Sequence, residues 1–141
     1  MKKIITKSAQ ETKSFAKNLA RDFLKGGIIA LSGELGAGKT TFAQGFAEGL
    51  GITHKIISPT FLIIRQYPIP NQKNFFFHID LYRLKKIDLK NSGLEEILSE
   101  PENVVLIEWA EKILKFPEYV TGIYIKFGGE TRREIRLTSR R

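Results

Sequence analysis

The sequence contains no cysteine, which excludes disulfides and thiolate metal sites. It also has no apolar run near the roughly 20 residues of a membrane-spanning helix, and its first residues lack the apolar core of a signal peptide. These absences predict a cytoplasmic protein without membrane contact. The 141 residues are 42 % hydrophobic and 27 % charged, which is ordinary for a globular protein. No repeat or linker divides them, so we expect one domain over residues 1–141 with a real hydrophobic core.

Acidic residues are scarce relative to basic ones. Lysine and arginine number 23 against 15 aspartate and glutamate, a formal net charge of +8. Such an excess suits an anionic partner such as a nucleotide or RNA. A solvated, lysine-rich surface explains it equally well, because the lysines are scattered and no basic–aromatic motif stands out. A solvated face is also the preferred interpretation of the arginines near the C-terminus, which are Arg132, Arg133, Arg136, Arg140 and Arg141.

One stretch carries a phosphate-binding motif. Residues 33–40 read Gly-Glu-Leu-Gly-Ala-Gly-Lys-Thr and fit the P-loop pattern G-x-x-x-x-G-K-[ST]. Its glycines let backbone N–H groups turn inward as an anion nest, and the helix that begins near Gly38 adds its N-terminal N–H groups. In this pattern Lys39 reaches the β- and γ-phosphates, and the Thr40 hydroxyl binds Mg²⁺. The stretch therefore predicts nucleotide binding.

The rest of the chain predicts an α/β fold with a mixed, mostly parallel sheet flanked by helices. A capping box, Ser8-x-x-Glu11, begins a first helix that we expect to end at Gly26-Gly27. A helix should also follow the P-loop to about residue 51, and a short one should cover 94–98. Strands are expected at 2–6 (an edge strand), 28–32, 61–67, 75–79 and 104–107, and a C-terminal antiparallel hairpin at 119–127 and 133–138.

Two acidic residues follow apolar strands, where a P-loop protein needs a carboxylate for Mg²⁺. They are Asp80 and Glu108. Because ligands of open α/β sheets lie beyond the carboxyl ends of the strands, both side chains can face the phosphates, and composition does not rank them. A carboxylate that only caps a turn is the alternative for each. His78 shares a strand face with Asp80, and we interpret it as a structural residue, with a proton carrier as the alternative.

The nucleotide is expected to be ATP. The guanine-reading Asn/Thr-Lys-x-Asp pattern is absent, since its nearest match begins with Leu84, and Arg83 stands where a GTPase switch has glycine. Arg83 itself fits an arginine finger in cis or a surface ion pair equally well. Trp109, next to Glu108, is interpreted as a core aromatic close to the site.

Four strings in this order resemble the TsaE (YjeE) family, over essentially the whole chain. They are residues 32–41, 58–61 (Ser-Pro-Thr-Phe), 78–84 (His-Ile-Asp-Leu-Tyr-Arg-Leu) and 106–111 (Leu-Ile-Glu-Trp-Ala-Glu). The family consists of small bacterial P-loop ATPases required for N6-threonylcarbamoyladenosine (t6A) modification of tRNA. The resemblance implies ATP and Mg²⁺ as cofactors and the TsaD and TsaB proteins as partners. ATP turnover would reset their complex for multiple rounds, and tRNA would be met indirectly or through that complex.

The resemblance also implies roles for individual residues. Lys39, Asp80 and Glu108 would be catalytic, with Asp80 needed for hydrolysis and Glu108 joining Thr40 at the metal. Thr60 would lie in a switch-like loop. Thr12 and an arginine of residues 130–133 would lie on the adenine side. The implied nucleotide contacts are Thr12, Glu34, Gly36, Ala37, Gly38, Lys39, Thr40, Thr41 and Arg133.

Two other functions use the same residues. A small-molecule P-loop kinase is one, although the chain has no arginine-rich lid segment and no acceptor-pocket signature. A non-hydrolysing, nucleotide-gated adaptor is the other. The adaptor would share every binding residue, so only Asp80 and Glu108 discriminate it from an ATPase.

Overall fold

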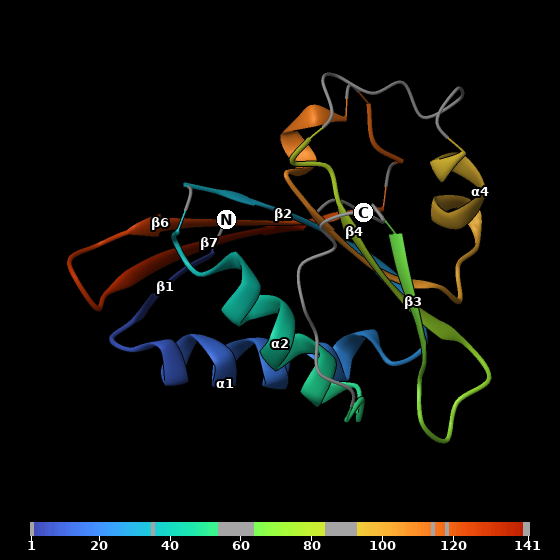
Figure 1. The fold of residues 1–141 in the computed structure, drawn as a ribbon, viewed down its shortest axis with the longest axis horizontal. Coiled ribbons are helices and arrows are strands. Elements are labelled where there is room, and N and C mark those ends of the chain that lie inside the picture. Colours follow the sequence, from blue (N-terminus) through green and yellow to red (C-terminus); the bar gives the residue numbers. More distant parts are fainter. Residues whose placement is uncertain are drawn as a thin grey trace.

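The computed structural model describes residues 2–34, 36–53, 64–83, 93–113, 115–117 and 119–139. Its strands form one mixed sheet of seven, in the order β1-β7-β6-β2-β5-β4-β3 (Figure 1). The four central strands pair in parallel, and antiparallel partners flank them at both edges. The predicted mixed sheet is therefore confirmed, and its parallel pairs lie in the centre. The strands are β1 (Lys2–Thr6), β2 (Gly27–Gly33), β3 (Ile64–Pro68), β4 (Phe75–Asp80), β5 (Val104–Glu108), β6 (Thr121–Phe127) and β7 (Arg133–Ser139).

Helices cover both faces of the central strands. They are α1 (Ala9–Ala20), α2 (Lys39–Gly49) and α4 (Leu94–Ser99), with 3-10 turns η1 (Arg21–Phe23) and η2 (Ala110–Lys112). Helices α1 and α2 pack on one face, and α4 and η2 on the other (Figure 1). Along β2, Ile29 and Leu31 face α1 and α2, whereas Ile28 belongs to the opposite core. The central strands are apolar throughout because each face buries its own cluster.

Helix α1 begins as predicted but ends differently. The Ser8 hydroxyl accepts the N–H of Glu11 at 3.1 Å. The Glu11 carboxylate accepts the N–H of Lys7 at 3.0 Å, one residue before the expected partner. The α-helix stops at Ala20, earlier than expected, and η1 makes the last turn before Gly26. Gly26 has φ +128°, and a Cβ there would lie 1.9 Å from the carbonyl oxygen of Pro101.

Two glycines let α1 and α2 approach closely. A Cβ on Gly45 would lie 2.3 Å from the carbonyl oxygen of Lys13, and one on Gly49 would lie 2.2 Å from that of Lys17. A side chain at either position would clash with the backbone of α1, so the two helices can pack this closely only with glycine there. The packing sets the first turn of α1, with Thr12, beside the loop that precedes α2.

The remaining elements follow the predictions where the structure describes them. The strand expected at 61–67 is β3, which extends to Pro68 before a turn in which Asn71 has φ +64°. The C-terminal strands β6 and β7 form the expected antiparallel hairpin. Residues 54–63, with Thr60, and residues 84–92 lie outside the described part of the chain. None of the described helices is long and apolar enough to cross a membrane.

Candidate functional site

The P-loop joins β2 to α2, as its pattern predicts. Gly33, Gly36 and Gly38 have φ values of +148°, +78° and +105°, which side-chain-bearing residues rarely adopt. A Cβ on Gly33 would also lie 2.2 Å from the carbonyl oxygen of Ile125 in β6. Gly38 is the N-cap of α2, so the N-terminus of the helix, where the dipole is positive, opens onto the loop. A loop of this kind at a helix N-terminus suits phosphate.

Lys39 is folded back onto the loop that contains it. Its Nζ donates to the carbonyl oxygens of Gly33 at 2.8 Å and Glu34 at 3.1 Å. The same Nζ lies 4.2 Å from the centre of the Trp109 ring. The ammonium therefore sits in the P-loop, held by groups that phosphate oxygens can replace.

The charge of Lys39 is balanced by burial and by carboxylates. Burial lowers the pKa of Lys39, and the negative charges of Glu108, Glu111 and Asp80 oppose this shift. The ammonium suits a phosphate group, and the carboxylates around it suit a divalent cation that would offset their negative charge.

Asp80 and Glu108 stand side by side at the carboxyl ends of β4 and β5, where the register pairs them directly. Glu108 is buried, and Asp80 is half-buried. Burial raises the pKa of Asp80, and the charge of Glu108 adds to the rise. The N–H of Tyr82, which donates to Asp80 Oδ1 at 2.9 Å, and the nearby His78 and Lys39 act in the opposite direction. The structure thus brings both candidate carboxylates to one edge of the sheet.

His78 holds Glu108 in place. Its Nε2 lies 2.5 Å from Glu108 Oε2, and both side chains are buried. The imidazole stacks on Phe76 with an interplanar angle of 6°. Its Nδ1 is buried and has no hydrogen-bond partner among the described residues. This geometry supports the structural interpretation of His78, which fixes the orientation of the Glu108 carboxylate.

Replacing His78 with Phe should destabilise the protein by about 2–3 kcal/mol, because the buried Glu108 carboxylate loses its hydrogen bond. Urea denaturation measures this cost. In a double-mutant cycle, adding Glu108→Leu should restore part of the stability and give a coupling of about 1–3 kcal/mol. Strictly additive costs would show that the pair does not hold the carboxylate.

Trp109 lies at the margin of the core with an unusual backbone conformation. Its φ is +60°, a left-handed conformation that is unusual for a bulky residue. In a regular strand, residue 109 would face away from Glu108. The left-handed turn instead puts the indole over Lys39, with the exposed Tyr82 ring 5.1 Å away. Trp109 is half-buried and packs partly on the core under α4 and partly against the P-loop lysine, so the core interpretation holds in part and its position close to the site is confirmed.

The β6–β7 hairpin is hydrogen-bonded to the P-loop at two points. Arg133 Nε donates to the carbonyl oxygen of Ala37 at 2.9 Å. Its Nη1 donates to carbonyl oxygens of the hairpin turn, including that of Glu130 at 3.2 Å, and its guanidinium stacks on the Phe127 ring. The N–H of Phe127 in turn donates to the Glu34 carboxylate at 3.2 Å. Arg133 and Glu34 therefore act on the shape of the loop in this structure.

A cavity of about 290 Å³ opens between the first turn of α1, the P-loop and the hairpin turn. Thr12 lines it, with its Oγ1 2.6 Å from that of Thr6. A larger cavity of about 690 Å³ lies at the opposite end of β2 and contains no predicted site residue. The smaller cavity collects six of the predicted nucleotide contacts, namely Thr12, Gly36, Ala37, Gly38, Thr41 and Arg133.

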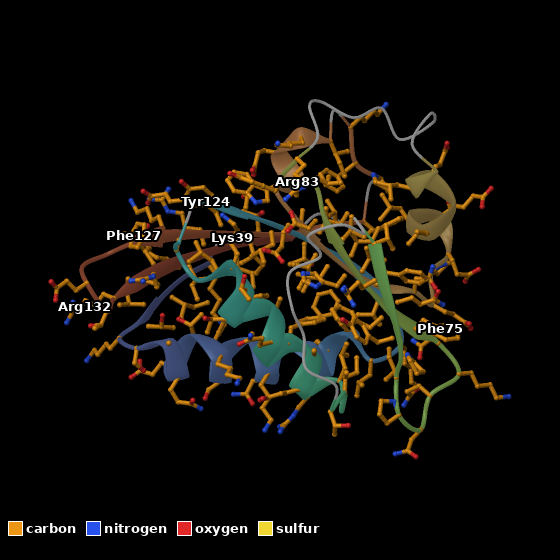
Figure 2. All side chains as sticks on the ribbon, viewed as in Figure 1. Lys39, Phe75, Arg83, Tyr124, Phe127 and Arg132 are labelled. Atoms are coloured by element: carbon orange, nitrogen blue, oxygen red, sulfur yellow. The ribbon has the colours of Figure 1, made fainter. Side chains whose placement is uncertain are left out.

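The other predicted residues lie around the phosphate end of the site. Thr40 is exposed in the first turn of α2, and Glu108 contributes a carboxylate. These hard oxygen donors fit Mg²⁺, which takes only one or two protein ligands in nucleotide sites. No group of three His, Asp or Glu side chains that could hold a metal by itself occurs in the described residues. Arg83 is exposed beyond the end of β4 (Figure 2).

Comparison with known proteins gives a consistent result. The family described as "Threonylcarbamoyl adenosine biosynthesis protein TsaE" matches residues 6–135. The tRNA threonylcarbamoyladenosine biosynthesis protein TsaE of Bacillus subtilis is 41 % identical over 138 residues, covering 95 % of this chain and 83 % of the relative. Its namesake from Nostoc sp. is 35 % identical over 144 positions, covering 98 % and 86 %. The crystal structure of YdiB from B. subtilis matches with a TM-score of 0.78 and 37 % identity, covering 99 % and 86 %.

Proposed function

Because the chain belongs to the TsaE family, we propose that it is an accessory ATPase of tRNA N6-threonylcarbamoyladenosine modification. Its role in t6A modification follows from the relatives, which are named for that pathway. One observation carries the ATPase part of the proposal: the buried P-loop lysine lies near two carboxylates at the carboxyl ends of β4 and β5. Lys39 binds phosphate there, while Asp80 and Glu108 serve hydrolysis.

The P-loop and the smaller cavity bind different parts of the nucleotide. The N–H groups of the P-loop bind the phosphates, and Lys39 Nζ exchanges two carbonyl oxygens for phosphate oxygens. The cavity beside Thr12 and Thr41 receives the nucleoside, with ATP favoured because the guanine-reading pattern is absent. Arg133 supports binding by fixing the Ala37 carbonyl, which keeps the loop open toward the cavity.

The metal and the water are assigned to different carboxylates. Thr40 and Glu108 would hold Mg²⁺, which neutralises phosphate charge when it is bound. His78 holds Glu108 in one orientation. Burial raises the pKa of Asp80 from its ordinary value, and a general base works best when its pKa rises toward the operating pH. Asp80 therefore orients the attacking water and accepts its proton.

TsaD and TsaB are the proposed partners, and ATP turnover resets their complex between rounds of modification. The test is reconstitution of t6A formation with purified TsaD and TsaB, with and without this protein and ATP. We expect slow ATP hydrolysis by the protein alone, faster hydrolysis with the partners, and more than one modified tRNA per complex only when all components are present. Phosphate transfer from ATP to a metabolite rather than to water would favour the kinase instead.

A further inference from the structure

One face of the sheet stays open at the hairpin end. Strands β6 and β7 bury Ile123, Ile125 and Ile135 toward α1 and α2. On the opposite face, neither β1, β6 nor β7 contributes to the core under α4. Figure 2 shows Tyr124 on the side of the sheet away from α1 and α2. The open sheet face consists of Lys3, Ile5, Tyr124, Lys126, Glu134, Arg136 and Thr138.

Three cations surround one carboxylate at the centre of the open sheet face. Glu134 is bridged by Lys3 Nζ at 3.1 Å, by Lys126 Nζ at 3.5 Å and by Arg136 Nε at 2.8 Å. Burial alone would raise the pKa of Glu134, but the bonds from Lys3 and Arg136 and the charge of Lys126 lower it overall. The ionised carboxylate thus holds three cationic side chains at a fixed spacing. Since those side chains are 37–56 % exposed, a net charge of about +2 faces solvent.

An aromatic ring lies within this cationic cluster. Tyr124 is 38 % exposed, and the register sets it opposite Arg136, which in turn pairs with Lys3. Lys126 follows two residues along the same strand and so shares the face with Tyr124. A ring on a sheet face beside several cations suits unpaired RNA, because a base can stack on the ring while phosphates bind the cations.

We propose that the open sheet face binds an unpaired segment of RNA. One base stacks on Tyr124, and the flanking phosphates bind Lys126, Arg136 and Lys3. Charge complementarity favours RNA over a protein partner, since the centre of a protein interface is depleted of charge and the centre of this face is a cluster of four charges. The proposal rests on the proposed t6A role only in one respect: that role makes RNA, rather than another polyanion, the expected ligand.

The position of this face links RNA to the nucleotide site. The same two strands hold the P-loop from their other side, through Phe127 and Arg133. RNA on one face and nucleotide beside the other would therefore contact a common two-stranded element. The cluster escapes sequence inspection because its members come from three strands that only the sheet brings together.

The test measures binding of a fluorescently labelled tRNA anticodon stem-loop to the full chain by anisotropy at several salt concentrations. Tyr124→Ala should weaken binding about tenfold, while Tyr124→Phe should retain it, because only the ring is needed. Lys126→Gln with Arg136→Gln should weaken binding about tenfold and lower the salt slope by about 1.4. As a control, Lys17→Gln on α1 with Arg21→Gln in η1 makes the same charge change at exposed positions and should weaken binding less than twofold.

Three results would overturn the proposal. An equal loss of RNA affinity in the Lys17/Arg21 control pair would show that RNA is attracted by the overall charge and not by this face. An unchanged affinity in Tyr124→Ala would show that no base stacks on the ring. Variants of the open sheet face that bind RNA normally but no longer associate with TsaD and TsaB would identify a protein interface. Lys39→Ala should bind RNA within twofold of the unmodified chain, so a failure of RNA binding is distinct from a failure of the ATPase proposal.

Discussion

Replacing Lys39 with alanine is expected to reduce ATP hydrolysis by a factor of about 10²–10³ and to weaken ATP binding. Lys39 is the only lysine or arginine that is buried among the described residues. In the proposed function its ammonium binds the phosphates in a partly desolvated site, where charge interactions are stronger than in water. Phosphate release measures the hydrolysis, and calorimetric titration measures the binding.

The folded state should survive this change. The substitution removes two hydrogen bonds to loop carbonyls, but it also removes an ammonium whose pKa is lowered by burial. These effects oppose each other, so the melting temperature should move by less than about 4 °C. Lys17→Ala, at an exposed position of α1, is the matched control and should leave hydrolysis unchanged. A Lys39→Ala protein that supports t6A formation at the normal rate would refute the ATPase proposal.

Replacing Asp80 with asparagine should stop hydrolysis while leaving ATP binding intact. We expect the rate to fall about 10²–10⁴-fold, the range for removing a general base, and the ATP affinity to change less than about threefold. In the unmodified protein the rate should fall on the acidic side as Asp80 gains a proton, at a pH above its usual pKa near 4 because burial raises that pKa. Asp22→Asn in the exposed η1 turn is the control.

The same substitution should stabilise the nucleotide-free protein. A carboxyl whose pKa is raised by folding binds its proton more tightly in the folded state, so its contribution to stability is present at low pH and is lost as pH rises through the folded pKa. Asparagine resembles the protonated form. We therefore expect a melting temperature about 2–4 °C higher at neutral pH, with the gain vanishing below about pH 4. A lower melting temperature at neutral pH would contradict the assigned pKa shift.

Asp80→Asn also separates the ATPase from the adaptor. If the variant binds ATP but stops both hydrolysis and repeated t6A formation, a role for nucleotide occupancy alone fails. If repeated t6A formation continues without hydrolysis, the ATPase proposal fails instead. Both outcomes are read from one reconstituted reaction.

The arrangement of the P-loop and the strand-end carboxylates could be predicted because its parts depend on local order. The P-loop needs only its own glycines and the lysine next to the helix start, and the carboxylates need only to follow apolar strands. Parallel strands then bring Asp80 and Glu108 to adjacent positions. The position of His78 on the face of Asp80 follows from the two-residue period, whereas its bond to Glu108 depends on the diagonal contact across two strands.

Contacts between distant elements could not be predicted in this way. Arg133 and Ala37 are 96 residues apart, and Phe127 and Glu34 are 93 apart, so no periodicity in the chain specifies how the hairpin meets the P-loop. The left-handed backbone of Trp109 is equally invisible, because propensity argues against it and only the packing around the residue maintains it. Likewise, residues 2–6 are recognisable as an edge strand, but their pairing with β7 is set by the whole sheet.

The position of Trp109 has a practical consequence for anyone who handles this protein. It is the only tryptophan of the chain, so the near-ultraviolet emission comes chiefly from one indole. That indole lies 4.2 Å from the Lys39 ammonium, which in the proposed function turns toward the phosphates of bound ATP. Indole emission responds to the position of a nearby charge. We therefore expect the tryptophan fluorescence of the unlabelled protein to change when nucleotide binds at the P-loop, so that binding can be followed in real time.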